Sequence, residues 1–410
     1  MIRIGILGCG RILNAHLQGF KQLRDQGDHG FRITALVARD EADAWMFHTR
    51  GQGPTPRPPA LPSASGDPLA APHTYLSDFQ NDTEVHVYSD YRRLIDDGVA
   101  DALLDTTPVY LHHTIGLATL DAGLHLLTQK PLAITVRAGH KLVQRAREKH
   151  LALGVFENAR YRPLTRAVRW AFDRGLLGRP QLALLGALGG PWSPDRIVAG
   201  TPWRHDKLLA GGGGSIDIGV HQMNILRYLF GEVQSVQAVA RTFEPERGSE
   251  KPVRASVDDT YLATVAFAED AVAQLIWSWA GRGEPFELAG APAFYGSRGC
   301  VKGGQLIMDG GTHLPLLEHF EKELDAARRR TWFPLDLRDP FAILQWQWLE
   351  GIRAGDQDPE TSGAEGLRDL AAAYAILESS VAGRPVTPDA VLAGTVDAYQ
   401  RELDLHYGLV

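Results

Sequence analysis

The first seven residues and the turn that follows them constrain the fold of this chain more than any other segment. Ile2–Leu7 is a compact apolar run, and Gly8-Cys9-Gly10-Arg11-Ile12-Leu13 comes directly after it and opens a helical pattern. In a strand–turn–helix unit the first glycine permits a tight turn, and the second lets a pyrophosphate approach the backbone at the positive end of the helix. Leu13 stands at the third glycine position of the G-x-G-x-x-G/A pattern, so a purely structural glycine turn is the alternative. The residues predicted to bind a dinucleotide are Gly8, Gly10, Arg11 and Ile12.

Further apolar runs alternate with helical stretches as far as Phe156. Runs that are apolar at consecutive positions are typical of strands buried on both faces of a parallel sheet. The alternation predicts right-handed βαβ units and therefore an α/β domain with a Rossmann-type, doubly wound parallel sheet. The predicted strands are Phe31–Ala38, Ala102–Pro108, Leu124–Leu127 and Leu151–Phe156, and the predicted helices include Thr114–Ala122 and Arg137–Lys149.

A proline-rich segment interrupts this alternation. Seven of the 24 prolines lie between Gly51 and Pro72, and such a stretch can be neither a helix nor a central strand. The β-rich run Val85–Tyr88 follows it. We therefore interpret residues 51–84, approximately, as an extended, polyproline-like surface insertion in the first domain. A polyproline ligand for another protein is the alternative.

The second part of the chain has a different pattern. Thr260–Phe267 and Val272–Trp279 alternate in polarity around the short turn Glu269-Asp270, which predicts an antiparallel hairpin. A sheet of this kind is typical of an α+β domain with an open, mostly antiparallel sheet. The predicted domains are 1–157 and 158–410, with the late helical patterns Ile343–Arg353 and Glu365–Val381 packing back on the first domain.

Charge and composition exclude several classes of protein. The chain has 410 residues, and 42 Lys+Arg against 49 Asp+Glu give a formal charge of −7, with no basic stripe for nucleic acid or a membrane surface. Two cysteines are too few for a disulfide scaffold or a thiolate metal cluster. No apolar window is long enough for a membrane-spanning helix, and no targeting segment is recognisable at the N-terminus. We therefore expect a cytoplasmic protein.

The residues after the second apolar run bear on the choice between NAD and NADP. A carboxylate at this strand end binds the ribose hydroxyls of NAD, whereas an arginine suits the 2′-phosphate of NADP. The sequence reads Val37-Ala38-Arg39-Asp40. A strand that ends at Ala38 puts Arg39 at the ribose and favours NADP, while a shift of one residue puts Asp40 there and favours NAD. A merely solvated Arg39 is the third interpretation; of the two cofactors, the sequence favours NADP.

Two further segments carry groups suited to chemistry. Lys130, in Gln129-Lys130-Pro131, follows the strand Leu124–Leu127, and ligands of open α/β sheets bind at the carboxyl ends of strands. Its ammonium can bind a reacting oxygen, although most lysines are simply solvated. Four glycines at 211–214 precede a helical pattern in which Asp217, His221 and Asn224 share a face at i, i+4 and i+7. A carboxylate beside an imidazole makes an oriented acid–base pair. An incidental surface pair and a metal pair are the alternatives, and the lack of further ligand spacing argues against a metal.

These motifs together resemble the Gfo/Idh/MocA family (glucose–fructose oxidoreductase, inositol dehydrogenase, rhizopine catabolism) over nearly the full chain. The resemblance depends on the order of the motifs as well as on each of them. Besides Gly8–Ile12 they are Thr106–His113, Ala122–Leu132, Glu157-Asn158, Arg160–Pro163, Trp203-Arg204, the glycine run with Asp217 and His221, Ser362-Gly363 and Gly366–Asp369.

The resemblance implies a pyridine-nucleotide oxidoreductase acting on sugars, polyols, inositols or related alcohols. It also implies an open sheet that forms the interface of a homodimer or homotetramer. The implied catalytic residues are Lys130, Asp217 and His221; those at the cofactor also include Thr107, Pro108, His112 and Gln129, and those at the substrate include Tyr161, Arg204 and Asn224. Two departures matter, because Gln129 replaces the usual glutamate and Asn224 replaces a frequent aspartate.

The sequence therefore predicts reversible hydride transfer between a nicotinamide and a carbon that bears a hydroxyl. In the oxidation direction we expect His221, oriented by Asp217, to accept the hydroxyl proton while Lys130 stabilises the developing alkoxide. Two alternatives stay open. One is a glycosidase on the same scaffold that uses a tightly held cofactor without net redox change, and the other is a non-catalytic sensor that binds nucleotide and sugar.

Overall fold

The computed structural model describes residues 1–287, 292–356 and 358–410, which form two compact units. Unit 1 comprises residues 1–134, 138–156 and 333–367, and unit 2 comprises 135–137, 157–332 and 368–410. The sequence predicts one domain boundary, after residue 157. The structure assigns the late segment 333–367 to unit 1 as well, because its helix packs on α1.

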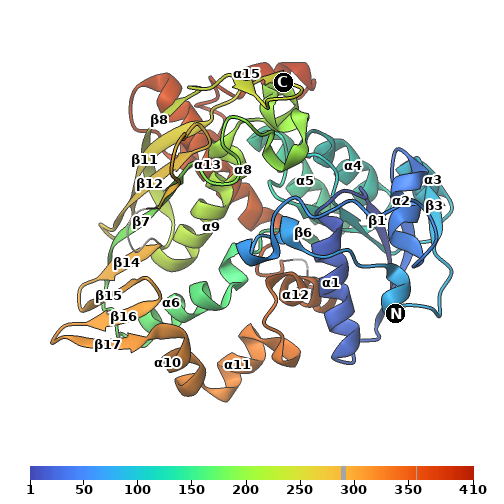
Figure 1. Ribbon diagram of the computed structural model, residues 1–410, viewed down its shortest axis with the longest axis horizontal. Helices are drawn as coiled ribbons and strands as arrows, with labels where there is room; N and C mark the ends of the chain where they lie inside the picture. Colours follow the sequence, from blue (N-terminus) through green and yellow to red (C-terminus); the bar gives the residue numbers. More distant parts are fainter. Residues whose placement is uncertain (288–291, 357) are drawn as a thin grey trace. The chain divides into compact units, whose positions relative to one another are not determined.

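Unit 1 contains a six-stranded parallel sheet in the order β3-β2-β1-β4-β5-β6 (Figure 1). This is the doubly wound order of dinucleotide-binding folds, and the chain reverses its direction of winding between β1 and β4. The predicted α/β fold is confirmed. The strands are β1 (Ile2–Leu7), β2 (Phe31–Val37), β3 (His86–Tyr88), β4 (Ala102–Asp105), β5 (His125–Gln129) and β6 (Leu153–Phe156).

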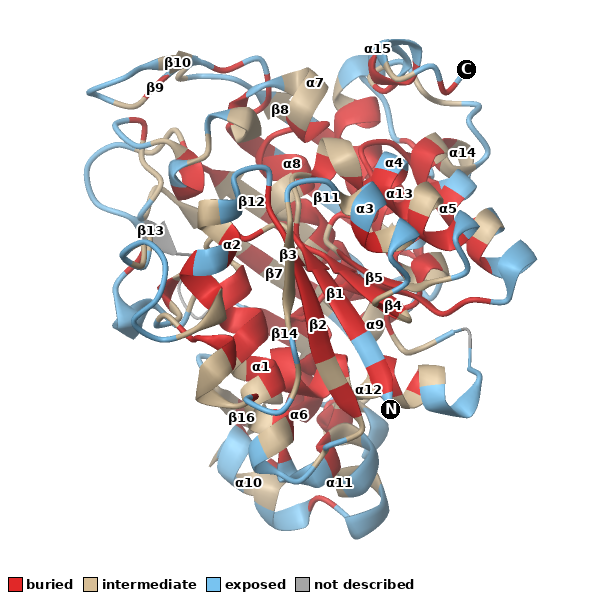
Figure 2. Ribbon diagram, turned by 90° about the vertical axis from the view of Figure 1, so that its right-hand side faces the viewer, coloured by how far each residue is buried: buried red, intermediate tan, exposed pale blue. Residues whose placement is uncertain are grey.

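The central strands of this sheet are buried on both faces, which explains their continuous apolar sequences. All four residues of β4 are buried, and Figure 2 shows β2 and β4 mostly in the colour of buried residues. Helix α1 packs against α12, which comes from far along the chain. The helices of unit 1 are α1 (Leu13–Asp25), α2 (Glu41–His48), α3 (Tyr91–Asp96), α4 (Val109–Asp121), α5 (Val136–Lys149, whose first two residues lie in unit 2) and α12 (Pro340–Ala354).

The proline-rich segment between α2 and β3 is partly packed rather than wholly exposed. It contains three 3₁₀ turns, η1 (Ser63–Ser65), η2 (Pro68–Ala70) and η3 (Leu76–Asp78), and η2 contacts α1. Leu61 is 5% exposed and Ala70 is 7% exposed. The expected extended surface excursion is therefore wrong in part, because apolar side chains within the segment bury themselves on unit 1.

Unit 2 contains a nine-stranded mixed sheet in which β7 and β12 are parallel and the other neighbours are antiparallel. The predicted hairpin is confirmed, since Thr260 pairs with Ser278 and Ala266 with Val272. The strands are β7 (Pro180–Leu188), β8 (Val233–Arg241), β11 (Thr260–Phe267), β12 (Val272–Ser278), β13 (Phe286–Glu287), β14 (Ala293–Gly296), β15 (Gly299–Lys302), β16 (Gln305–Met308) and β17 (Thr312–Pro315). A separate pair joins β9 (Glu246–Arg247) and β10 (Val253–Arg254).

Helices complete unit 2 around large buried side chains such as Trp170 and Tyr261. They are α6 (Pro163–Asp173), α7 (Lys207–Ala210), α8 (Gly214–Asp217), α9 (Gly219–Phe230), α10 (Leu316–Glu323), α11 (Ala326–Trp332), α13 (Gly363–Ala382, which begins in unit 1), α14 (Pro388–Leu392) and α15 (Arg401–His406). None of the described helices combines the length and the apolar character needed to cross a bilayer.

Candidate functional site

The turn between β1 and α1 lies where the sheet of unit 1 changes its winding direction. Gly8 has φ = 93°, a conformation that costs glycine little and other residues much more. A Cβ at Gly8 would also lie 2.8 Å from the carbonyl carbon of Thr106, the residue that follows β4. Glycine at this position therefore lets the ends of β1 and β4 approach each other, which is the crevice where open α/β sheets bind ligands.

The surroundings of Gly10 and Arg11 fit an anionic group. A Cβ added to Gly10 would meet no atom within 4 Å, so open space adjoins this part of the turn. Ile12, which precedes α1, makes no side-chain cap, and the first amides of the helix, from Leu13 on, donate to carbonyl oxygens of the turn. The amides of Gly10, Arg11 and Ile12 make no hydrogen bond within the described residues, so they are the donors left for a ligand at the positive end of the helix. The Nε atom of Arg11 is buried and has no hydrogen-bond partner among the described residues. These features suit the pyrophosphate of a dinucleotide.

The residues after β2 distinguish the two ribose-binding alternatives. The side chain of Asp40 accepts a hydrogen bond of 3.0 Å from the Ala42 amide and caps α2. Arg39 is exposed, and it makes no hydrogen bond or ion pair within the described residues. Asp40 is thus engaged in stabilising its own helix, whereas the Arg39 guanidinium is accessible to an external anion.

His112 connects the segment after β4 with the segment after β5. One ring nitrogen lies 2.9 Å from the Thr107 carbonyl oxygen, and the other lies 2.9 Å from the Pro131 carbonyl oxygen. Thr107 itself is fixed by its hydroxyl, which donates to Asp105 Oδ1 at 2.6 Å. Pro108 occupies the N-cap position of α4 with extended backbone. The predicted cofactor residues of these two segments therefore share one network.

Gln129 and Lys130 come at the end of β5, and a cis peptide bond joins Lys130 to Pro131. The Gln129 Nε2 atom lies 2.6 Å from Nε2 of His16, a residue that no sequence motif indicated. Burial lowers the pKa of His16 to about 3, so the imidazole is neutral, and in the tautomer with the proton on Nδ1 its Nε2 accepts the hydrogen bond from the Gln129 amide. A neutral amide at 129 is compatible with a neutral His16, whereas a glutamate carboxylate there would favour the protonated imidazolium.

Asp217 and His221 do not share one helix. Asp217 ends α8, Ile218 separates the two helices, and His221 lies in the first turn of α9. The predicted i, i+4, i+7 face is therefore wrong for Asp217, whereas His221 and Asn224 both lie in α9 as predicted for one helix. The preceding glycines have a structural reason, because a Cβ at Gly213 would lie 1.7 Å from the Asp258 carbonyl oxygen. The buried Asp258 carboxylate accepts from the amides of Gly213 and Ser215, at 2.8 Å each.

The carboxylate that holds His221 is Glu157, rather than the predicted Asp217. Nδ1 of His221 lies 2.5 Å from Oε1 of Glu157, whose side chain is 2% exposed. Asp217 instead faces Arg204, with Oδ2 and Nε 3.6 Å apart. The predicted orienting role of Asp217 is corrected accordingly. Glu157-Asn158 directly follows β6, and it was among the motifs of the family resemblance, although no role was predicted for Glu157.

The three predicted substrate contacts differ in accessibility. Asn224 is fully buried, with its Oδ1 accepting from Arg160 Nε at 3.2 Å and its Nδ2 donating to Asp369 at 2.7 Å. Tyr161 is 1% exposed. Arg204 is partly exposed and stacks on Trp203, with its guanidinium carbon 4.3 Å from the ring centroid. Asn224 and Tyr161 thus belong to the interior of unit 2, and Arg204 is the accessible one.

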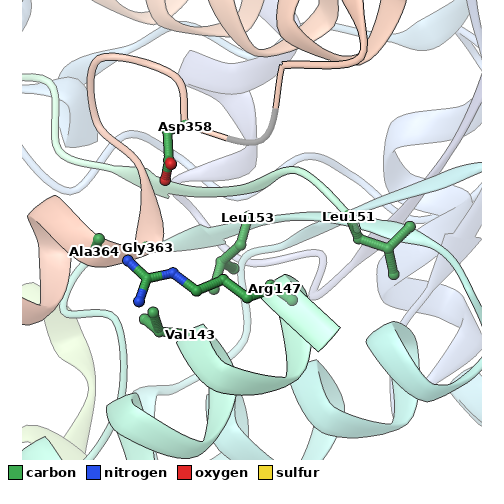
Figure 3. A pocket seen from close by; sticks show the side chains of 8 residues that line it. Val143, Arg147, Leu151, Leu153, Asp358, Gly363 and Ala364 are labelled. Atoms are coloured by element: carbon green, nitrogen blue, oxygen red, sulfur yellow. The ribbon is translucent and has the colours of Figure 1, made fainter. Parts of the chain in front are cut away.

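A small hollow elsewhere in unit 1 does not match the candidate site. Val143 and Arg147 of α5 line it together with Leu151, Leu153 and the segment around Gly363 (Figure 3). It lies beside the amino end of β6, away from the carboxyl ends at which such sheets bind ligands. Within the described residues, no group of three or more His, Cys, Asp or Glu side chains could hold a metal ion.

Two family models match the chain. The model described as "Oxidoreductase family, NAD-binding Rossmann fold" matches residues 69–157, and "GFO/IDH/MocA C-terminal domain" matches residues 165–302.

Two of the curated relatives are a dehydrogenase and a reductase. Levoglucosan dehydrogenase of Pseudarthrobacter phenanthrenivorans is 32% identical over 236 residues, which cover 52% of this chain and 58% of that protein. 1,5-Anhydro-D-fructose reductase of Ensifer adhaerens is 27% identical over 297 residues, covering 71% of this chain and 80% of that protein. The match thus spans less than two thirds of the first relative.

Solved structures share the fold. Levoglucosan dehydrogenase in complex with NADH and levoglucosan has a TM-score of 0.69 at 20% identity, covering 94% of this chain and 99% of that one. An oxidoreductase from Agrobacterium radiobacter, in complex with NAD+, L-tartaric acid and magnesium, has a TM-score of 0.69 at 19% identity, covering 95% and 99%.

Proposed function

The chain belongs to the Gfo/Idh/MocA family of oxidoreductases, and from this premise we propose that it transfers hydride between a nicotinamide cofactor and a CH–OH carbon of a sugar or polyol. The observation that carries the proposal is the turn from Gly8 to Ile12. At the crevice of the sheet it combines open space beside Gly10 with the amides of Gly10, Arg11 and Ile12, which make no hydrogen bond within the described residues. The sugar class is taken from the dehydrogenases and reductases to which the chain is similar.

In the proposed oxidation, His221 accepts the proton of the substrate hydroxyl. Glu157 accepts the hydrogen bond from Nδ1–H, so the tautomer leaves Nε2 as the acceptor for that proton. The same carboxylate stabilises the imidazolium that forms. When bound, the nicotinamide supplies C4 as the acceptor of the hydride that leaves the carbinol carbon.

Lys130 is the proposed electrostatic group. Its ammonium would stabilise the developing negative charge on the substrate oxygen as the proton leaves. Arg204, held against Trp203 and facing Asp217, is the proposed contact for other substrate hydroxyls. Asp217, which lies at the end of α8 and is 23% exposed, is proposed to fix Arg204 and to accept a hydrogen bond from a substrate hydroxyl.

We propose that the preferred cofactor is NADP. The exposed Arg39 suits a 2′-phosphate, and Asp40 is engaged in capping α2. A screen of sugars and polyols with NAD+ and NADP+ in parallel, followed by nicotinamide absorbance, tests function and cofactor together. Reduction of NADP+ by at least one sugar is expected. Product formation without any absorbance change would instead indicate a redox-neutral glycosidase, and binding without turnover would indicate a sensor.

We also propose that copies of the chain associate through the outer face of the unit 2 sheet. Val239, Leu262 and Ile276 are cross-strand neighbours on β8, β11 and β12, and the first two are 50% and 46% exposed. An apolar row of this kind is typical of an interface. Light scattering should detect a dimer or tetramer, and Leu262→Lys should shift it towards monomer. A monomeric wild-type protein would contradict this proposal.

A further inference from the structure

The proline-rich segment is anchored to unit 1 on both sides of its central residues. Before them, Gly53 has φ = 77°, and a Cβ there would lie 2.6 Å from the Trp45 carbonyl oxygen of α2. After them, Gln18 of α1 donates to the Pro72 carbonyl oxygen at 3.2 Å. The amide of Thr74 donates to Asn14 Oδ1 at 3.3 Å. Anchors on α2 and α1 hold the intervening residues beside the two loops that begin those helices.

Arg57, between these anchors, reaches the glycine turn. Its Nη2 donates to the Cys9 carbonyl oxygen at 2.7 Å and lies 3.2 Å from Oδ1 of Asp43, in the first turn of α2. The side chain is 33% exposed. Both contacts use Nη2. Within the described part of the chain, Nε and Nη1 make no hydrogen bond, so their N–H groups can donate to a ligand. An arginine from the insertion therefore bridges the β1–α1 turn and the start of α2.

The place that Arg57 occupies is the adenosine end of a dinucleotide site. β1 and β2 are parallel neighbours, with Leu7 opposite Val37, and the Gly8 amide donates to the Val37 carbonyl oxygen at 2.9 Å. In folds of this type the adenosine ribose lies outside the carboxyl ends of these two strands. Arg39 follows β2 at the same edge. Two guanidinium groups thus border the position of the ribose, one from the strand end and one from the insertion.

We propose that Arg57 binds the 2′-phosphate of NADP together with Arg39, so that the proline-rich insertion determines cofactor specificity. This inference rests on the proposed nicotinamide-dependent function. A planar guanidinium makes short, charge-assisted hydrogen bonds to phosphate oxygens. Asp43 holds Arg57 in place when no phosphate is present and competes with the phosphate for the guanidinium.

The test is isothermal titration of the full-length protein with NADPH and with NADH. Loss of charge-assisted hydrogen bonds predicts that Arg57→Ala weakens NADPH binding by about tenfold or more. NADH has no 2′-phosphate, so its affinity should change by less than about threefold. Raising the salt concentration should weaken NADPH binding less in Arg57→Ala than in the wild type, because one charge contact is gone.

Three further variants distinguish the loss of the Arg57 guanidinium from a general effect on folding. Arg50→Ala is the matched control, because Arg50 comes from the start of the same segment but pairs with Asp78 and lies over Tyr75. It should leave both affinities unchanged. Arg57→Lys keeps the charge without the planar fork and should lose part of the NADPH affinity, which decides the question if Arg57→Ala does not fold. Asp43→Asn should tighten NADPH binding, since the competing carboxylate is removed.

Several outcomes would overturn the inference. The first is a wild-type protein that binds NADH more tightly than NADPH. The second is an equal loss of affinity for both cofactors in Arg57→Ala, and the third is an unchanged affinity for NADPH in both Arg57 variants. In each of these cases cofactor binding persists and the proposed oxidoreductase function stands. A wild type that binds neither cofactor would overturn the proposed function, and the inference with it.

Discussion

The two units hold their candidate residues in different ways. In unit 1 the nucleotide turn is five consecutive residues, Gly8–Ile12, and it acts through its backbone and a helix end. In unit 2 the acid–base pair joins Glu157, after β6, to His221, in α9, across 64 positions. A backbone site needs only local conformation, whereas a side-chain site needs the packing that brings distant residues together. The two kinds of site should therefore fail differently when altered.

The largest expected effect is on catalysis in unit 2. Removing a positioned acid–base group costs on the order of 10²–10⁴-fold in rate, so His221→Ala should lower kcat by that factor. NADPH affinity should stay unchanged, because the nucleotide turn lies in unit 1. Steady-state kinetics and a cofactor titration on the same preparation measure both quantities. Unchanged kcat would remove His221 from the mechanism.

The nucleotide turn offers a contrast between two glycines. Gly8→Ala combines a positive φ with a Cβ 2.8 Å from the Thr106 backbone, and such strain costs about 1–3 kcal/mol of stability. Gly10→Ala meets no atom within 4 Å and should leave stability unchanged while obstructing the cofactor. Urea unfolding together with NADPH titration distinguishes the two. Equal destabilisation by both variants would contradict a ligand-facing Gly10.

Substitution of Glu157 tests whether Glu157 acts through His221 in the acid–base pair of unit 2. Glu157→Gln keeps the shape but removes the charge that stabilises the imidazolium, so kcat should fall by about 10–100-fold, less than for His221→Ala. In His221→Ala the same Glu157 substitution should have little further effect, because the residue acts through His221. Additive losses in the double variant would show an independent role for Glu157.

The smallest expected effect is on the stability of unit 1 and concerns His16, which contacts Gln129 at the end of β5. Burial lowers its pKa from 6.5 to about 3 in the folded state, so the unfolded chain takes up this proton first as the pH falls. The resulting stability is fully present above about pH 6.5 and is lost as the pH falls towards 3. By about pH 5.5 the loss is roughly 1.4 kcal/mol.

The matched variant for this effect is His16→Gln, which cannot titrate. Urea unfolding at about pH 8 and pH 5.5 should show a shallower loss of stability in His16→Gln than in the wild type. Other buried histidines, among them His113 and His205, contribute equally to both proteins, so the difference isolates His16. Parallel pH dependences would mean that His16 is not held neutral.

Much of the architecture could be predicted because its signals are local. The strands of unit 1 are continuous apolar runs, and β1 has the predicted bounds Ile2–Leu7. The hairpin of β11 and β12 follows from alternation around a turn. The break at Ile218 could not be predicted, because its surroundings are helical in sequence and the division into α8 and α9 accompanies the approach of Gly213 to Asp258.

The side chains of the candidate site required the fold. His16 is the partner of Gln129 only because α1 and the end of β5 meet in unit 1, with Phe156 and Phe341 packed around the ring. Arg57 looked like part of an exposed excursion, because nothing in a proline-rich sequence indicates which carbonyl oxygen a guanidinium will meet. Asn224 was predicted to share a face with His221, and the structure buries it, hydrogen-bonded to Arg160 and Asp369.

The sequence by itself determined the parallel sheet, the glycine turn at its crevice and the family resemblance. These depend on apolar periodicity and on backbone conformations that only glycine adopts easily, both of which are local properties. Only the tertiary structure decided that Glu157 holds His221, that Asp40 caps a helix while Arg39 stays accessible, and that the insertion delivers Arg57 to the turn. Hydrogen bonds between distant side chains depend on distances of a few ångströms, and those are set by how the elements pack.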